Sequence, residues 1–210
     1  DELLLIPFIG RNGLIQACQI RFMKHVEGRS GNYVWLSSAK ERLGSSPGSP
    51  LHHVRPCDNV ENPVVVTEGA LKAATAQRFL LDRYVVGNSG VATAHRAIVE
   101  TARGRSLEIA FDNDSFTNPH VARALAELLR LRYLDQAAYG FDEEVRIITW
   151  DGSVKGIDDA LLSGLRLKYL TAAKWLKCLT PKCFEWADHQ LVSIGSKKTG
   201  GRQAAEWPSR

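Results

Sequence analysis

The chain has 210 residues, of which 44% are apolar, and its formal net charge is +4. This length and composition suffice for one substantial hydrophobic core. No apolar run is long enough to cross a bilayer, and the first residues lack the basic and then apolar order of a secretory signal. The four cysteines are too few and too dispersed for a disulfide framework. We therefore expect a cytoplasmic globular protein that makes no membrane contact.

The first sixty residues have the pattern of strands and turns. Residues 3–9 and 14–22 are strand-like and flank the turn signal Gly-Arg-Asn-Gly at 10–13, which predicts a hairpin. Residues 32–37 continue the strand pattern, and the Gly, Ser and Pro residues of 44–50 predict a loop. We assign residues 1–61 to a small strand-rich segment.

From residue 63 the pattern changes to alternating strands and helices. Strands are predicted at 64–67, 84–86, 107–111 and 145–150, and helices at 70–81, 91–102, 119–133 and about 160–179. Such alternation predicts an α/β fold in which a mostly parallel sheet carries helices on both faces. Right-handed crossovers bring the carboxyl ends of the strands to one edge, where open α/β sheets bind ligands.

Three acidic clusters lie at or just beyond the ends of three predicted strands. They contain Glu68, then Asp112 and Asp114, then Asp158 and Asp159. Each has an ordinary explanation on its own, because D-x-D arises often by chance and helix starts favour acids. Together they predict a site for a hard cation, since Mg²⁺ prefers carboxylate oxygens and leaves room for water and a phosphate.

The order of these motifs resembles the toprim domain, which is shared by bacterial replicative primases, type IA and II topoisomerases, OLD-type nucleases and small toprim nucleases. T-E-G-A at 67–70 looks like the first motif of that family, F-D-N-D at 111–114 like its D-x-D, and K-G-I-D-D at 155–159 like its late acidic motif. Residues 86–91 are similar to the Gly-containing turn of primases. The likeness is greatest to toprim-like primase domains of phage, plasmid and mobile-element replication proteins, and it covers about residues 62–165.

The resemblance implies a toprim, Rossmann-like fold and a role for each acidic residue. Glu68 would be the general acid or base, and Asp112, Asp114 and Asp158 would bind Mg²⁺ or Mn²⁺. Glu68 and Asp159 complete the predicted metal-binding set. Lys155 is expected to offset the negative charge or to contact a phosphate.

Nucleic-acid or nucleotide binding is predicted for residues outside the acidic set. Gly69 allows close approach of backbone or substrate, and Gly90 belongs to the primase-like turn. Lys72 would face the site from the first turn of its helix, with a solvated surface lysine as the alternative. The remaining candidates are the cations Arg21, Lys24 and Arg42, which could equally form a solvated face.

Charge is unevenly distributed along the sequence. Asp and Glu outnumber Lys and Arg between residues 61 and 162, whereas the reverse holds on both sides. Basic flanks around an acidic centre slightly favour a nucleic-acid partner. Residues 166–210 are predicted to form a C-terminal helix and a flexible basic tail that includes Lys197, Lys198 and Arg202.

The preferred functional interpretation is a primase catalytic domain that joins ribonucleotides on single-stranded DNA. The strand-rich segment 1–61 is expected to guide template or nucleotide. The expected partners are the template, nucleotides, and a replicative helicase or a fused helicase domain. A nuclease would need the same carboxylates, so it stays an alternative, as does a non-catalytic nucleic-acid-binding module. A type IA topoisomerase is disfavoured because it requires a much larger ring-shaped body. The sequence contains no helicase nucleotide-binding motif and no upstream zinc module.

Overall fold

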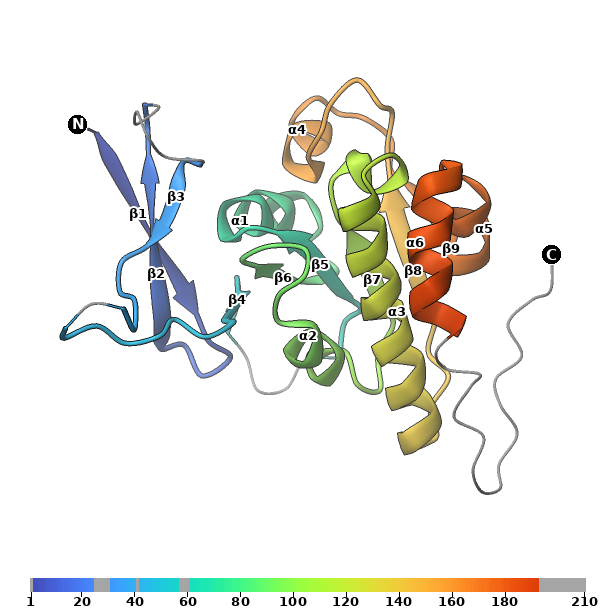
Figure 1. Cartoon of the computed structure of the whole chain (residues 1–210), viewed down its shortest axis with the longest axis horizontal. Helices are drawn as coiled ribbons and strands as arrows, with labels where there is room; N and C mark the ends of the chain where they lie inside the picture. The colour runs from blue at the N-terminus through green and yellow to red at the C-terminus, as the bar shows by residue number, and fades with distance from the viewer. Residues whose placement is uncertain (1, 25–30, 41, 57–60, 193–210) are drawn as a thin grey trace.

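The computed structural model describes residues 2–24, 31–40, 42–56 and 61–192. These residues form a three-stranded sheet and a six-stranded sheet, with the small sheet beside helix α1 of the larger body (Figure 1). Within these ranges, no helix combines the length and the apolar character that a membrane span requires. The predicted basic tail with Lys197, Lys198 and Arg202 lies outside the described residues.

The small sheet confirms the predicted N-terminal hairpin. It consists of β1 (Leu3–Ile9), β2 (Ile15–Phe22) and β3 (Tyr33–Trp35), paired antiparallel in the order β1-β2-β3. The turn between β1 and β2 uses Gly13 at a positive φ of 79°. Ile6 and Phe8 are buried against Ala70, so this sheet packs onto the helix that follows the first acidic motif.

The large sheet is mostly parallel, as predicted. Its strand order is β4-β6-β5-β7-β8-β9, and the four central strands pair in parallel. The strands are β4 (Leu51–His53), β5 (Val64–Glu68), β6 (Tyr84–Asn88), β7 (Leu107–Ala110), β8 (Val145–Thr149) and β9 (Lys168–Thr171). The two edge strands, β4 and β9, pair antiparallel and were not predicted from the sequence.

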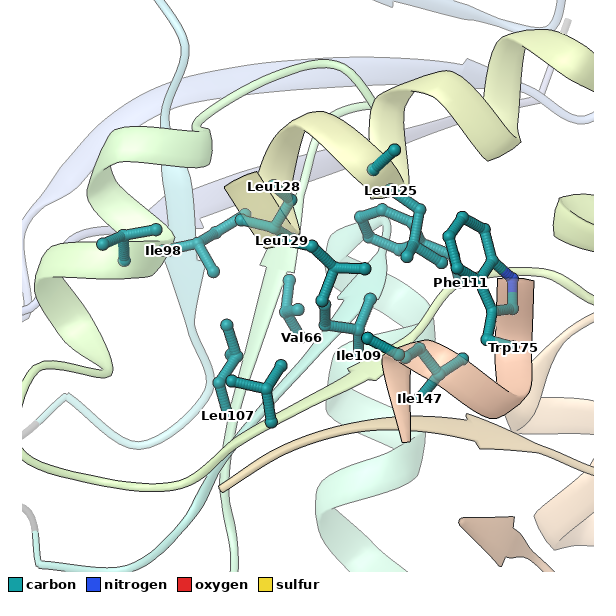
Figure 2. Packing of buried hydrophobic residues seen from close by; sticks show 14 of the residues in the cluster. Val66, Ile98, Leu107, Ile109, Phe111, Leu125, Leu128, Leu129, Ile147 and Trp175 are labelled. Atoms are coloured by element: carbon teal, nitrogen blue, oxygen red, sulfur yellow. The ribbon is translucent and has the colours of Figure 1, made fainter. Parts of the chain in front are cut away.

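Helices cover both faces of the large sheet. One face carries α1 (Ala70–Phe79) and α4 (Ile157–Leu162). The other carries α2 (His95–Thr101), α3 (Pro119–Tyr139), α5 (Ala172–Lys177) and α6 (Pro181–Val192). Figure 2 shows the larger core, in which Val66, Ile109 and Ile147 pack against helix residues such as Leu125 and Trp175. Alternate strand residues face opposite cores, which is the two-residue period of a β-strand.

The prediction of one helical region over 160–179 is wrong. Helix α4 ends at Leu162, and Gly164 turns the chain at a positive φ of 68°. Residues 168–171 then form β9, in which Thr171 pairs with Arg146 and Lys168 with Thr149 of β8. Strand β9 gains its hydrogen bonds from β8, a tertiary contact that a helical sequence pattern cannot reveal. Helix α2 also starts later than predicted, because Ala94 adopts the left-handed conformation just before it.

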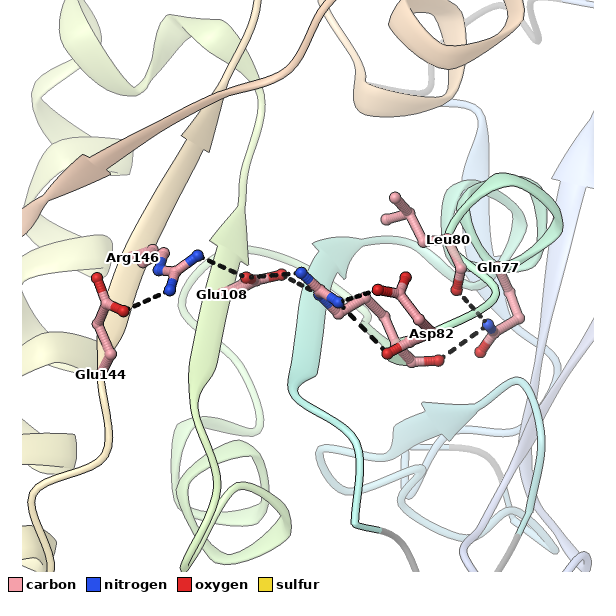
Figure 3. A network of polar contacts seen from close by, with 7 residues as sticks. Gln77, Leu80, Asp82, Glu108, Glu144 and Arg146 are labelled. Carbon is pink, nitrogen blue, oxygen red and sulfur yellow. Dashed lines mark hydrogen bonds and ion pairs between the residues drawn. The ribbon is translucent and has the colours of Figure 1, made fainter.

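A buried carboxylate lies near the amino end of β7. Glu108 is only 2% exposed and accepts a hydrogen bond of 2.8 Å from Nε of Arg83. Nη1 of Arg146 lies 3.7 Å from its other oxygen, and both arginines pair with a second acid, Asp82 or Glu144 (Figure 3). This network ties the segment before β6 to strands β7 and β8.

Candidate active site

The strand register brings the acidic motifs together at the carboxyl ends of the parallel strands. Thr67 of β5 pairs with Ala110 of β7, so Glu68 and Asp112 lie just beyond the last pair. Strand β7 ends at Ala110, close to the predicted end at residue 111, and residues 113–116 form a 3-10 helix, η1, directly after Asp112. Asp158 approaches the same region from the first turn of α4, whose neighbour on this face is α1.

Two lysines connect these acids. Nζ of Lys72, on the first turn of α1, forms an ion pair with Oδ1 of Asp112. Nζ of Lys155 lies 3.6 Å from Oδ2 of Asp112 and 3.3 Å from Oδ2 of Asp114, so it bridges both members of the D-x-D motif. The Asp112 side chain is 5% exposed, whereas that of Lys155 is 67% exposed. Lys72 therefore belongs to the site, and Lys155 covers it from the solvent side.

Gly156 allows Asp158 and Lys72 to approach the chain closely. A Cβ at position 156 would lie 2.3 Å from Oδ1 of Asp158, closer than real Cβ contacts, and 3.2 Å from Cε of Lys72, which is a tight contact. Glycine at this position thus permits the third acidic motif to pack against the lysine that contacts the second motif.

The middle residue of the D-x-D motif, Asn113, forms hydrogen bonds to the end of β8 and to the loop that follows it. Asn113 accepts a hydrogen bond of 3.1 Å from Oγ1 of Thr149, and its Nδ2 donates to the carbonyl of Val154 at 3.3 Å. Its backbone N–H also donates to the carbonyl of Lys155 at 3.1 Å. This residue was not predicted to be functional, although its place between two aspartates is a usable signal. It positions the loop that carries Lys155.

Electrostatic interactions within the site shift the pKa values of two groups. Burial raises the pKa of Glu68, and the nearby carboxylates of Asp112 and Asp114 raise it further, against the opposing effect of Lys72 and Lys155. The carboxylate of Asp114, followed by those of Asp112 and Glu68, raises the pKa of Lys155. Glu68 thus holds a proton more readily than an ordinary glutamate, while Lys155 stays charged.

The donor atoms suit a divalent cation. Oδ1 of Asp114 and Oδ1 of Asp158 are buried and have no hydrogen-bond partner within the described residues. In the same part of the chain, no three His, Cys, Asp or Glu side chains are grouped so as to hold a metal ion by themselves. Mg²⁺ fits this arrangement, because it keeps several waters and is usually held by one or two carboxylates together with substrate phosphates.

The other predicted site residues lie in different surroundings. Asp159 is exposed, and the contacts described above do not include it. Gly69 lies between β5 and α1 with a positive φ of 89° and open space where a Cβ would point, so its backbone conformation is what requires glycine. Gly90 follows β6 and accepts hydrogen bonds from Asn88 and Thr93 through its carbonyl.

The predicted nucleic-acid-binding cations lie in or after the small sheet. Arg21 is half-buried in β2 and stacks its guanidinium 5.6 Å from the centre of the Tyr33 ring. Because Arg21 pairs with Leu4, it shares the face of Ile6 and Phe8 that packs against Ala70 of α1. Lys24 and Arg42 are exposed.

Asn88 is a further polar residue at the site. It pairs with Glu68 in the sheet register, and its carbonyl accepts a 2.7 Å hydrogen bond from Gly69 N–H. The side chain is fully buried, and its Oδ1 has no hydrogen-bond partner among the described residues. An asparagine at the carboxyl end of a strand beside the first acidic motif is the signal that would have identified it.

The family model described as a domain of unknown function, DUF3854, matches residues 56–165. The chain belongs to this family. The matched region contains the whole acidic cluster, Lys72, Lys155 and the central parallel strands, whereas the small sheet and α6 lie outside it. No curated protein matches the chain.

The structure is similar to catalytic domains of DNA primases. A DNA primase domain from Pseudomonas aeruginosa matches with a TM-score of 0.57 and 17% identity, over 78% of this chain and 48% of that one. The primase fragment of the bacteriophage T7 primase-helicase matches with a TM-score of 0.50 and 17% identity, over 77% and 58%. A DnaG primase catalytic domain bound to single-stranded DNA matches with a TM-score of 0.53 and 16% identity, over 78% and 48%.

At these identities the similarity shows the fold alone. The chain spans only about half the length of these structures, 48% to 58%. The predicted architecture, a mostly parallel sheet with helices on both faces and a small strand-rich segment before it, is confirmed. Toprim membership stays a prediction from the motifs, because the matching family model does not carry that name.

Proposed function

We propose that this chain is the catalytic domain of a DNA primase, which synthesises short primers on single-stranded DNA during phage or mobile-element replication. One observation supports this proposal above the others: Asp112 and Asp114 form ion pairs with two lysines beyond the carboxyl end of β7 in a primase-like sheet, with Asp158 close by at Gly156. One buried oxygen each of Asp114 and Asp158 has no hydrogen-bond partner among the described residues.

Asp112, Asp114 and Asp158 are the residues that would hold Mg²⁺ or Mn²⁺, with Glu68 beside them. A bound divalent ion would polarise phosphate oxygens and neutralise the charge that develops during phosphoryl transfer. Glu68, whose pKa is raised by burial and the neighbouring aspartates, would take the proton of an attacking hydroxyl. Lys72 keeps Asp112 oriented through their ion pair.

The small sheet would guide the template. Arg21 and Tyr33 share the sheet face that packs onto α1, and α1 starts directly after Glu68 and Gly69. A cation next to an aromatic ring is a suitable contact for a single strand, because the ring stacks on bases while the cation meets phosphates. Lys24 and Arg42 would extend this basic surface, and a helicase, separate or fused, would deliver the strand.

A nuclease is the second candidate, because water could replace the attacking hydroxyl at the same carboxylates. The deciding experiment incubates labelled ribonucleotides and end-labelled single-stranded DNA with the protein and Mg²⁺ or Mn²⁺ in one reaction. Primase activity yields new labelled oligonucleotides and an intact template. Template shortening without nucleotide incorporation would establish the nuclease instead. No product of either kind would leave a missing partner domain or a non-catalytic binding module, and the same assay with the full-length protein would decide between them.

A charge reversal tests the role of the small sheet. Arg21→Glu combined with Lys24→Glu should weaken single-stranded DNA binding at least about tenfold at low salt, because each phosphate contact releases counterions. Metal binding should not change, because the two functions lie in different sheets. Lys174→Glu combined with Lys177→Glu in α5 is the matched control and should leave DNA binding much closer to wild type. Equal losses in the two double variants would remove the template-guiding role.

A further inference from the structure

The two lysines of the acidic site differ in their accessibility, although both contact Asp112. The Lys72 side chain is 27% exposed and is held between Asp112 and Gly156. The Lys155 side chain is 67% exposed and reaches the cluster from a loop. Lys72 contacts Oδ1 of Asp112, whereas Lys155 contacts Oδ2 of Asp112 and Oδ2 of Asp114.

This arrangement separates a fixed counter-ion from an exchangeable one. Moving Lys72 would break its ion pair with Asp112, whose side chain is buried, and its packing beside Gly156. Moving Lys155 needs only rotations of a mostly solvated side chain, and Asp112 then keeps its ion pair with Lys72. The backbone of Lys155 stays in place, since its carbonyl accepts the hydrogen bond from Asn113 N–H.

We propose that the Lys155 ammonium occupies the place of a divalent cation between Asp112 and Asp114, and that metal binding releases it toward the phosphates of the incoming nucleic acid. The inference rests on the proposed function, because it takes the two aspartates as metal ligands and a phosphate polymer as substrate. Lys72 remains on Asp112 throughout and leaves that residue a single oxygen for the metal. Lys155 thereby couples metal occupancy to substrate binding: the free protein holds metal weakly, and the loaded protein gains a cation for phosphate.

Calorimetric titration with Mn²⁺ alone tests the exchange without any activity measurement. Lys155→Gln removes the competing charge from the site while keeping a long polar side chain. It should bind Mn²⁺ roughly tenfold more tightly than wild type at low ionic strength, because one positive charge no longer opposes a divalent ion at short range. Lys174→Gln, an exposed lysine of α5, is the matched control and should bind like wild type. Unchanged or weaker binding by Lys155→Gln, or no binding by any variant, would overturn the proposal.

Lysine side-chain NMR distinguishes exchange from a general charge effect. On addition of Mg²⁺, the Cε and Nζ resonances of Lys155, assigned by their loss in Lys155→Arg, should move toward the positions of a free lysine. The resonances of Lys72 should move much less. A Lys155 signal that stays unchanged while Mg²⁺ binds would show that this side chain does not leave the carboxylates and would overturn the inference.

The released charge should appear in the salt dependence of DNA binding. With Mg²⁺, the slope of log K against log salt for a single-stranded oligonucleotide should be smaller in Lys155→Gln than in wild type by about 0.7, the contribution of one phosphate contact. With EDTA the two slopes should agree, because Lys155 is then engaged by Asp112 and Asp114. Equal slopes in both conditions would overturn the phosphate role. If Lys155→Gln binds metal more tightly but the wild-type protein makes no primers, the exchange would be supported and the proposed function would be wrong.

Discussion

A buried carboxylate lies near each end of strand β7, and the two differ in the kind of cation that pairs with them. Glu108, near the amino end, is bound by two arginines that each pair with a second acid. Asp112, just beyond the carboxyl end, is contacted by two lysines, and its neighbours Asp114 and Asp158 each have a buried oxygen that finds no hydrogen-bond partner in the described part of the chain. The planar guanidinium of arginine can donate two hydrogen bonds to one carboxylate, whereas the ammonium of lysine is a point charge on a flexible side chain.

The difference separates a structural charge cluster from a functional one. At the Glu108 end, each of the three acids has an arginine partner, and these pairs join the segment before β6 to β7 and β8. At the Asp112 end, burial and then the neighbouring aspartates raise the pKa of Glu68, and Asp114 and Asp158 each have a buried oxygen without a hydrogen-bond partner among the described residues. Unpaired buried oxygens cost stability, so their presence together with a shifted pKa favours a catalytic role.

Asp112→Asn should produce the largest effect on activity. The proposed primer synthesis should fall by roughly 10³-fold, because the amide cannot replace a carboxylate in neutralising and holding a cation. The protein should stay folded, because the amide oxygen of the variant can still accept a hydrogen bond from Lys72 and because Lys155 can turn toward water. Primer synthesis is measured by nucleotide incorporation and folding by circular dichroism. Activity close to wild type would remove Asp112 from the catalytic set.

Glu108→Gln should produce the largest effect on stability. Removing this charge leaves the partly buried Arg83 and Arg146 without the carboxylate that they share. The free energy of unfolding should therefore fall by about 2 kcal/mol. Denaturant unfolding gives this value, and Asp112→Asn serves as the comparison with a smaller loss. The folded fraction of Glu108→Gln should keep its specific activity. A greater stability loss in Asp112→Asn would reverse the assignment of the two clusters.

The sequence predicts the elements whose signals are local or strongly periodic. The four central strands, the hairpin and the places of Glu68, Asp112, Asp114 and Asp158 follow from apolar runs and from acids at strand ends. The edge strands β4 and β9 could not be predicted in this way, because they are short and their pairing with β6 and β8 decides their conformation. Figure 1 shows both at the margins of the large sheet.

The side-chain contacts between the motifs of the site also could not be predicted from the sequence. Lys72 can pair with Asp112 because α1 lies beside α4 and because Gly156 has no side chain in the way. The fastening of Asn113 to Thr149 depends on two segments meeting in space. Such contacts join residues from different motifs, so a motif read alone identifies the acids but not the cations that accompany them.

Glu68→Gln should have the smallest effect on stability, and its sign tests the excess of negative charge at the Asp112 end. Because burial and the aspartates raise the pKa of Glu68 in the folded protein, ionisation of this group lowers stability as the pH rises above the ordinary value of 4.5. In EDTA at pH 7, Glu68→Gln should therefore be as stable as wild type or slightly more so in thermal unfolding. Near pH 4 and below, where wild-type Glu68 is protonated in the folded protein, the advantage should vanish. Glu61→Gln, an exposed glutamate, should show no such pH-dependent difference. A marked loss of stability in Glu68→Gln at pH 7 would make Glu68 a structural residue. It would also contradict the excess of negative charge around Asp112.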